Sequence, residues 1–195
     1  TEPAKRDIDI IVDSISEKEV LEESSAVDPV TGNPITNAIF VTANGTGNGT
    51  RENPTNILDL HTSAEGETYF AEEDDVIILL GDDGVIDIGD YIDTFPSLQL
   101  LDGQKLLSPG GELELASVDD PEKVAYLRPV GTKATLTNST PLVSERINVI
   151  KTANNITISG IKFEGADYFI RGTHLAPKSN ININNNIFSK MRDRT

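Results

Sequence analysis

The sequence predicts an all-β protein whose C-terminal part is a right-handed parallel β-helix. Short β-branched strands recur about every 10 to 12 residues, separated by Gly, Asn, Asp, Ser and Pro. No strongly amphipathic helix lies between them. Two segments near the end, Asn155–Phe163 and Asn180–Phe188, repeat one pattern 25 residues apart. A repeat of roughly 20 to 29 residues is typical of one coil of a solenoid.

The repeat aligns NITISGIKF with NININNNIF. The candidate structural residues form four aligned pairs: Asn155 with Asn180, Ile156 with Ile181, Ile158 with Ile183, and Phe163 with Phe188. Residues two apart on a strand point to the same side, so we expect Ile and Phe to stack in a continuous core. We expect the Asn amides to stack at a corner and to bond between coils. Chance similarity between two Asn- and Ile-rich strands is the alternative.

Residues 1–37 are predicted to be an extended linker or lead-in. Asp7–Val12 alternates like a short strand, and Ser16–Glu23 carries a capping-box pattern with a narrow apolar stripe. Asp28–Pro34 is rich in turn residues.

The packed domain is predicted over residues 38–195. Ile39–Val41 is a strand, and a Gly/Asn/Thr loop, Asn44–Pro54, follows it. Thr55 or Asn56 then caps a short helix that reaches about Ala64. The continuous apolar strand Val76–Leu80 is expected either to be buried on both faces or to start a wall of the core.

Further strands are expected down the rest of the chain. They are Val85–Ile88, Leu98–Leu101, Lys105–Leu107, Leu113–Ala116, Ala125–Pro129, Ala134–Thr137, Asn148–Lys151, Ile156–Ser159, Ile161–Phe163, Phe169–Ile170, Ile181–Asn184 and Ile187–Phe188.

Three segments carry a resemblance to a known family. Gly49–Pro54 (GTRENP) matches a Gly-Thr…Asn-Pro turn motif. Asp75–Leu79 matches an apolar first core strand, and Leu101–Leu107 (LDGQKLL) matches a motif found in one coil. Over about residues 38–190, the chain resembles the opening of right-handed β-helix passengers of bacterial surface proteins, such as invasin/intimin-type inverse autotransporters and related adhesins. It departs from their pattern at Ser108–Gly110, where they have Gly directly after the Leu.

The resemblance implies a pectin-lyase-like solenoid with an N-terminal cap helix and further coils beyond Thr195. It also implies a virulence-associated adhesin, either secreted or on the cell surface as an outer-membrane-anchored passenger. The implied partner is a protein or glycan on a host or neighbouring cell.

The amino-acid composition excludes or disfavours several classes of partner and chemistry. The formal net charge is −16, from 32 acidic and 16 basic residues, which disfavours nucleic acid. There is no Cys, which excludes disulfides and thiolate chemistry. No apolar run approaches the ~18 residues of a membrane helix, so no membrane-inserted segment is predicted.

The acidic cluster is the main candidate for chemistry. Asp82, Asp83, Asp87 and Asp90 are candidate Ca²⁺ ligands, although their order does not match an EF-hand loop. The favoured interpretation is solvated carboxylates in turns, with no catalytic residue and no cofactor. His61 and His174 stand far apart in the sequence and do not suggest a metal pair.

The sequence therefore predicts a non-enzymatic surface or secreted segment that acts in adhesion or as a structural stalk. The alternative is a carbohydrate-active β-helix enzyme, a polysaccharide lyase or hydrolase, with Lys162 and Arg171 flanking a groove with Glu164 and Asp167. A third hypothesis is a self-associating structural module.

Overall fold

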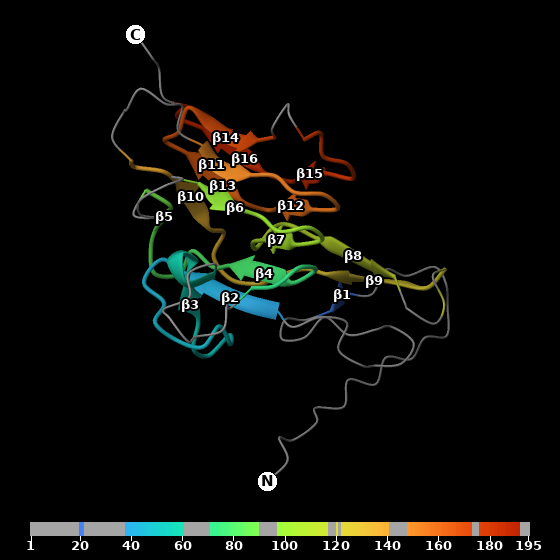
Figure 1. The fold of residues 1–195 in the computed structure, drawn as a ribbon. Coiled ribbons are helices and arrows are strands. Elements are labelled where there is room, and N and C mark those ends of the chain that lie inside the picture. The colour runs from blue at the N-terminus through green and yellow to red at the C-terminus, as the bar shows by residue number, and fades with distance from the viewer. Residues whose placement is uncertain are drawn as a thin grey trace.

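A computed structural model of the chain shows an all-β protein (Figure 1). The structure describes residues 20–21 (backbone only), 38–60, 71–89, 97–116, 120, 122–140, 148–172 and 176–191. These residues contain sixteen strands and one 3-10 helix. Most strands belong to three parallel sheets, and a fourth sheet, of three strands, lies outside them. The prediction of an all-β protein is confirmed.

The largest sheet has six strands, all paired in parallel. In spatial order they are β3 (Thr55–Asn56), β2 (Ala38–Thr42), β4 (Val76–Leu79), β7 (Lys105–Leu107), β12 (Thr157–Ser159) and β15 (Asn182–Asn184).

Two smaller sheets are parallel as well. One holds β5 (Ile86–Asp87), β10 (Thr135–Thr137), β13 (Lys162–Glu164) and β16 (Ile187–Ser189). The other holds β6 (Leu98–Gln99), β11 (Asn148–Lys151) and β14 (Tyr168–Arg171).

The chain visits these three sheets in a fixed order. From β4 it runs through β5 and β6 and returns to the six-stranded sheet at β7. The same order repeats from β7 through β10 and β11, and from β12 through β13 and β14, and it begins once more at β15 and β16. We call each such passage a circuit. The circuits are numbered from the one that contains β2, so β4 begins circuit 2, and β15 and β16 belong to circuit 5. Successive circuits lie one above the other, from β2 and β3 at the bottom of Figure 1 to β14–β16 at the top.

Apolar side chains stack between circuits on the inside of the three sheets. Ile77, Leu106, Ile158 and Ile183 follow one another across the six-stranded sheet. The four-stranded sheet aligns Ile86, Leu136, Phe163 and Phe188. All except the two members in circuit 5 are fully buried and belong to one core. Burial of this inner column is the main stabilising term of the fold.

A second core lies on the outside of the six-stranded sheet. Phe40, Val76, Ile78 and Leu107 point away from the inner core and pack under Leu113, Leu115 and Leu127. Because residues of β4 alternate between the two cores, Val76–Leu79 is buried on both faces, which is one of the two arrangements predicted from its continuous apolar sequence.

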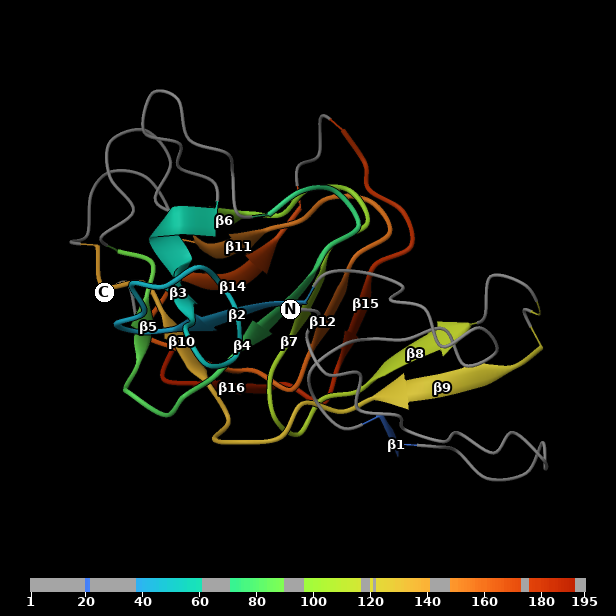
Figure 2. The ribbon, with the colours of Figure 1, turned by 90° about the horizontal axis from the view of Figure 1, so that it is seen from below.

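The covering elements of the outer core are β8 (Leu113–Ala116) and β9 (Val124–Leu127), which pair antiparallel as a hairpin. Figure 2 shows this hairpin extending to one side of the parallel sheets. The sequence predicts strands at Leu113–Ala116 and Ala125–Pro129, and the structure contains strands there, but they pair with each other and with β1 and not with the three parallel sheets. Their alternating pattern reports one buried face but not whether the partner strand is parallel or antiparallel.

The first circuit ends in a short cap. β3 pairs with the end of β2, and η1, a 3-10 helix at Ile57–Leu60, follows it directly. The side-chain oxygen of Asn56 accepts the backbone N–H groups of Leu58 and Asp59 at 2.7 and 3.2 Å, so Asn56 is the N-cap. The expected cap helix is thus a single 3-10 turn within the described residues, and the rest of its predicted range, up to Ala64, lies outside them.

One strand lies in the segment predicted as a lead-in. β1 (Val20–Leu21) pairs in parallel with β9, opposite Tyr126 and Leu127. This part of residues 1–37 therefore adds to the hairpin sheet rather than standing apart from the domain. The other residues of that range lie outside the described part of the chain.

Candidate functional site

The carboxylate of Asp83 joins two turns that are about forty residues apart in sequence. Its Oδ1 accepts the N–H of Ala43 at 2.8 Å, and its Oδ2 accepts the N–H of Asn44 at 2.9 Å. Burial raises the pKa of Asp83, but hydrogen bonds from Asn44, Ala43 and the Thr42 side chain outweigh it, so the pKa lies below its ordinary value. A carboxyl group held ionised in this way is a poor general acid.

The carboxylates of Asp87 and Asp82 also accept hydrogen bonds that link turns. Asp87 Oδ1 accepts the N–H groups of Gly89 at 2.8 Å and Ser139 at 2.9 Å, and Asp82 Oδ1 accepts the N–H of Thr132 at 3.3 Å. The predicted Ca²⁺ ligands Asp82, Asp83 and Asp87 are thus each bonded to backbone donors of another circuit or turn. Asp90 lies outside the described residues, among which no group of three or more metal-ligating side chains gathers.

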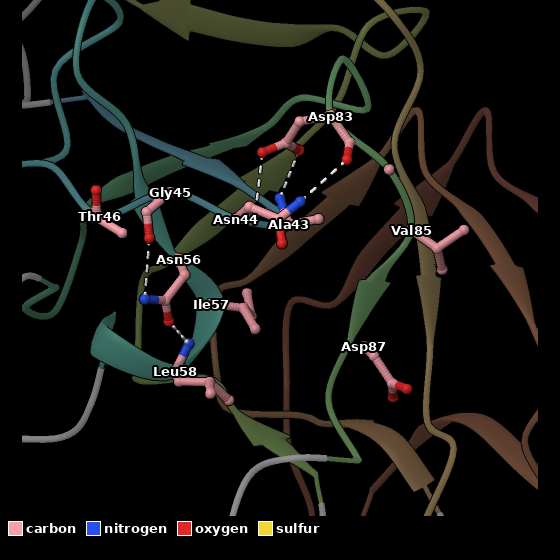
Figure 3. A pocket seen from close by; sticks show the side chains of 11 residues that line it. Ala43, Asn44, Gly45, Thr46, Asn56, Ile57, Leu58, Asp83, Val85 and Asp87 are labelled. Carbon is pink, nitrogen blue, oxygen red and sulfur yellow. Dashed lines mark hydrogen bonds between the residues drawn. The ribbon is translucent and has the colours of Figure 1, made fainter.

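A cavity of about 500 Å³ opens beside Asp83. Its walls come from the turn after β2, the start of η1 and the turn between β4 and β5 (Figure 3). Asn56 Nδ2 donates to Gly45 O across one wall at 3.1 Å, and Val85 contributes an apolar side chain that is 50% exposed. The volume suits a small ligand. In Figure 3 the carboxylates of Asp83 and Asp87 lie on different sides of the cavity, so they do not form an adjacent acid–base pair.

A polar ladder runs along one corner of the circuits. Both carboxylate oxygens of Asp102 accept hydrogen bonds from Asn154, from its backbone N–H at 2.8 Å and its amide at 2.9 Å. Asn154 Oδ1 in turn accepts the N–H of Ser179 in the next circuit at 3.2 Å. The hydrogen bonds from Asn154 lower the pKa of Asp102. The corner is therefore a chain of hydrogen bonds rather than an open set of ligands.

The residues singled out by the repeat are brought together in pairs. Asn180 Nδ2 donates to Asn155 Oδ1 at 2.8 Å. Ile158 pairs with Ile183, and Phe163 with Phe188, whose rings stack at a centroid distance of 5.3 Å.

The first Ile of each repeat lies just before its strand. Ile156 is buried, and its carbonyl accepts the N–H of Asn182 at 2.9 Å. Its counterpart Ile181, like Ile183 and Phe188, is partly exposed because it belongs to the last described circuit.

The basic residues considered for a carbohydrate groove are engaged in local contacts. Lys162 and Lys190 each lie 3.2 Å from the Glu164 carboxylate, and they lower its pKa. The guanidinium of Arg171 lies over the ring of Tyr168 at 5.7 Å, and Asp167 is buried. Lys162 shares β13 with Glu164, Arg171 shares β14 with Tyr168, and Lys190 directly follows β16, so each of these basic groups has a structural partner.

Sequence reasoning did not identify the roles of Asp83, Asp102 and Asn154. The available signal is an Asp-Gly pair in each turn, Asp83-Gly84 and Asp102-Gly103. Asp-Gly predicts a turn. It does not reveal that the Asp carboxylate bonds to backbone groups 39 to 52 residues away.

The site and fold together define an all-β protein with three parallel sheets, in which the carboxylates of Asp82, Asp83, Asp87 and Asp102 accept hydrogen bonds from neighbouring turns. No family model matches this chain, and no curated protein or solved structure is significantly similar to it. No helix in the described part of the chain is long and apolar enough to cross a membrane.

Proposed function

We propose that the chain is a segment of a right-handed parallel β-helix of the pectin-lyase-like type. We further propose that it acts without enzymatic activity, as a stalk or adhesive segment of a bacterial surface or secreted protein. The fold proposal is supported by the fixed order in which the chain visits three parallel sheets and by the 25-residue register between β12 and β15. Each circuit contacts mainly its neighbours, as in proteins built from stacked repeats.

The functional proposal rests on one observation: several carboxylates form hydrogen bonds that link one circuit to the next. Asp82, Asp83, Asp87 and Asp102 each accept a backbone N–H from a residue 39 to 52 positions away. A catalytic carboxylate must reach a substrate proton or a reacting carbon. Each of these carboxylates instead has at least one oxygen hydrogen-bonded to a neighbouring turn, which suits a rigid spacer.

The acidic composition fits the same role. A net charge of −16 keeps an extended protein soluble and limits non-specific association. On the outer face of circuit 5, Asn182 is exposed and Asn184 is partly exposed, whereas Thr157 and Ser159, with which they align, are buried. The Asn side chains offer amide groups for contact with a glycan or protein. We propose that adhesion, where it occurs, uses this face.

The test separates an adhesive or spacer segment from a carbohydrate-active enzyme. The full chain is incubated with a panel of neutral and acidic polysaccharides, with and without Ca²⁺, and both new chain ends and retention on the immobilised polysaccharides are measured. We expect no new chain ends. Retention would identify the adhesive role, and no retention would identify the spacer role.

Turnover that disappears in Asp87→Ala, while the variant keeps the circular dichroism spectrum and melting temperature of the wild type, would overturn the proposal in favour of an enzyme. Location is tested by antibody labelling of intact cells of the source bacterium. Labelling that appears only after permeabilisation contradicts a surface role.

A further inference from the structure

The cavity of about 500 Å³ beside Asp83 has no part in the proposed stalk or adhesive role. It lies beside β5, which pairs only with β10 among the described residues. The turn after β2 and the start of η1 form the opposite wall (Figure 3). A hollow of this volume, with both polar and apolar walls, is typical of sites for small molecules.

Three residues on the β5 side of the cavity form one row. Ile86 and Ile88 are fully buried in the inner core. Because successive side chains of an extended strand point to opposite sides, Val85 and Asp87 point away from that core. Asp83 precedes Val85 at the same spacing, and all three residues line the cavity. The row reads carboxylate, apolar, carboxylate, and its two ends are at most about 13 Å apart along the backbone.

The carboxylates and amides of the walls leave acceptors, rather than donors, for a ligand. Asp87 Oδ1 accepts the N–H groups of Gly89 and Ser139, but Asp87 Oδ2 has no hydrogen-bond partner in the described part of the chain. Asn44 Nδ2 donates to Asp83 O at 3.1 Å, so the carbonyl oxygen of the Asn44 amide remains an acceptor.

The other amide of the walls offers no donor either. Asn56 Nδ2 donates both to Gly45 O at 3.1 Å and to Asp59 Oδ2 at 2.6 Å, which uses its two N–H groups. A ligand that fills the cavity must therefore bring its own N–H or O–H donors.

The charge of the cavity selects a cationic ligand. None of the lining residues is basic, and neither Asp83 nor Asp87 forms an ion pair within the described residues. The hydrogen bonds from Ala43 and Asn44 keep the pKa of Asp83 below its ordinary value, so this carboxylate is ionised at neutral pH. Two uncompensated negative charges repel an anionic ligand and attract a cation.

The positions of the two carboxylates distinguish a metal ion from an organic cation. A Ca²⁺ ion needs several oxygens at about 2.3 to 2.6 Å from one point. In Figure 3 the carboxylates of Asp83 and Asp87 lie on different sides of the cavity, so they do not converge on one ion. Two separate ammonium groups can each meet one carboxylate. The apolar side chain of Val85, which is 50% exposed, lies between them in the row and suits a methylene chain.

We propose that this cavity binds an α,ω-diamine or polyamine, a ligand with two ammonium groups joined by a methylene chain. One ammonium group pairs with Asp83 and the other with Asp87, while the chain lies against Val85. The binding needs no covalent step. It is a second property of the molecule, independent of the proposed stalk or adhesive role.

The first test titrates the full chain with a series of α,ω-diamines of increasing chain length by isothermal calorimetry. We expect saturable one-to-one binding, with the highest affinity at one chain length that matches the spacing of the carboxylates. The monoamine of that length should bind about tenfold or more weakly, because it lacks one charged hydrogen bond. Affinity that rises with ligand charge but shows no preferred length overturns the proposal, as does a monoamine that binds as tightly as the diamine.

The second test removes one carboxylate and keeps its shape. Asp87→Asn retains an oxygen for the N–H groups of Gly89 and Ser139 but loses the charge. We expect the affinity for the best diamine to fall by about tenfold or more, and the affinity for the monoamine to change much less. Glu73→Gln is the matched control, because Glu73 is exposed and does not line the cavity, and it should leave binding unchanged. Equal losses in both variants indicate non-specific attraction to the acidic surface and contradict a site.

A competition with Ca²⁺ completes the experiment. We expect Ca²⁺ to weaken diamine binding only as much as another salt of the same ionic strength. Saturable Ca²⁺ binding that displaces the diamine and disappears in Asp87→Asn identifies a metal site instead. Circular dichroism and the melting temperature check the fold of Asp87→Asn. The chain-length series uses the wild type alone, so it decides the matter even where the variant does not fold, and a wild type without saturable diamine binding refutes the proposal.

Discussion

The side-chain amides of Asn155 and Asn180 are joined by a hydrogen bond of 2.8 Å, and both residues have a left-handed backbone, with φ of 55° and 53°. Asn tolerates this conformation better than other residues with a Cβ atom, because its short amide bonds locally. Asn therefore has two roles at this corner. It adopts the left-handed backbone of the turn with little strain, and its side chain links two circuits.

Substitution of Asn155 separates these two contributions. Asn155→Gly loses the amide bond and keeps access to the left-handed backbone, whereas Asn155→Ala loses both. We expect the free energy of unfolding to fall by about 1 kcal/mol for Gly and by about 2 to 3 kcal/mol for Ala. Urea unfolding of both variants checks this order. Equal losses would show that the backbone conformation contributes little at this corner.

The Asn155–Asn180 pair also shows what the sequence allows one to predict. Asn155–Phe163 and Asn180–Phe188 share their polar and apolar order, and a parallel pairing at an offset of 25 residues is the register the structure contains. The prediction succeeded because a shift by one residue would turn Ile158 out of the core and would remove Ile183 from its place over Ile158. The apolar pattern alone is enough to specify such a register.

Other parts could not be predicted from the sequence. Leu113–Ala116 alternates like a strand of the repeat, but its partner β9 runs antiparallel and outside the three parallel sheets. The bonds from Asp83 and Asp102 join turns about 40 and 52 residues apart, and a turn sequence carries no record of its distant acceptor or donor. Insertions such as the β8–β9 hairpin also change the spacing between circuits, which hides the repeat before Asn155.

The Phe stack provides a test of where the core ends. Phe163 is fully buried and lies against both Phe169 and Phe188, at centroid distances of 5.9 and 5.3 Å, whereas Phe188 is 50% exposed. We expect Phe163→Ala to lower the free energy of unfolding by about 3 to 5 kcal/mol. Phe188→Ala should cost about 1 kcal/mol, because half of its surface already contacts water. Chemical denaturation of both variants, in dilute solution, compares the two values.

Similar losses for the two Phe variants would contradict the exposed position of circuit 5. Phe163→Leu is a matched control, because it keeps an apolar side chain in the stack and removes only the ring. It should be less destabilising than Phe163→Ala.

Acidification should weaken the fold through Asp83. Its pKa lies below the ordinary value of 3.8, because hydrogen bonds from Asn44, Ala43 and Thr42 outweigh the effect of burial. The ionised form is therefore favoured in the folded chain. The stability that Asp83 contributes is complete above pH 3.8 and is lost as the pH falls through the lower folded-state pKa.

Asp83→Asn removes this titration. We expect the variant to be less stable than the wild type at neutral pH and to lose less stability on acidification below pH 4. Asp102→Asn should behave in the same direction, because hydrogen bonds from Asn154 lower the pKa of Asp102 as well. Urea unfolding at neutral and acid pH measures the difference, and parallel pH curves for wild type and variants would contradict it.

The close approach of two turns at Gly160 should make this position intolerant of any side chain. Gly160 has φ of 84°, and a Cβ atom there would lie 2.3 Å from Ser108 O and 2.4 Å from Gly111 N. These neighbours are backbone atoms and cannot rotate away. The left-handed backbone alone costs about 1 to 2 kcal/mol for Ala, and separation of the turns adds to it.

We therefore expect Gly160→Ala to lower the free energy of unfolding by more than about 2 kcal/mol. Gly172→Ala is the matched control, because a Cβ atom at Gly172 would meet Thr152 Oγ1 at 3.4 Å, an ordinary contact. This control should lie within about 0.5 kcal/mol of the wild type. Denaturation curves that show Gly160→Ala to be as stable as Gly172→Ala would mean that the turns of circuits 3 and 4 do not meet at Gly160. A large loss of stability for Gly160→Ala, but not for Gly172→Ala, would place the close contact between the two turns at Gly160, because both variants add the same methyl group.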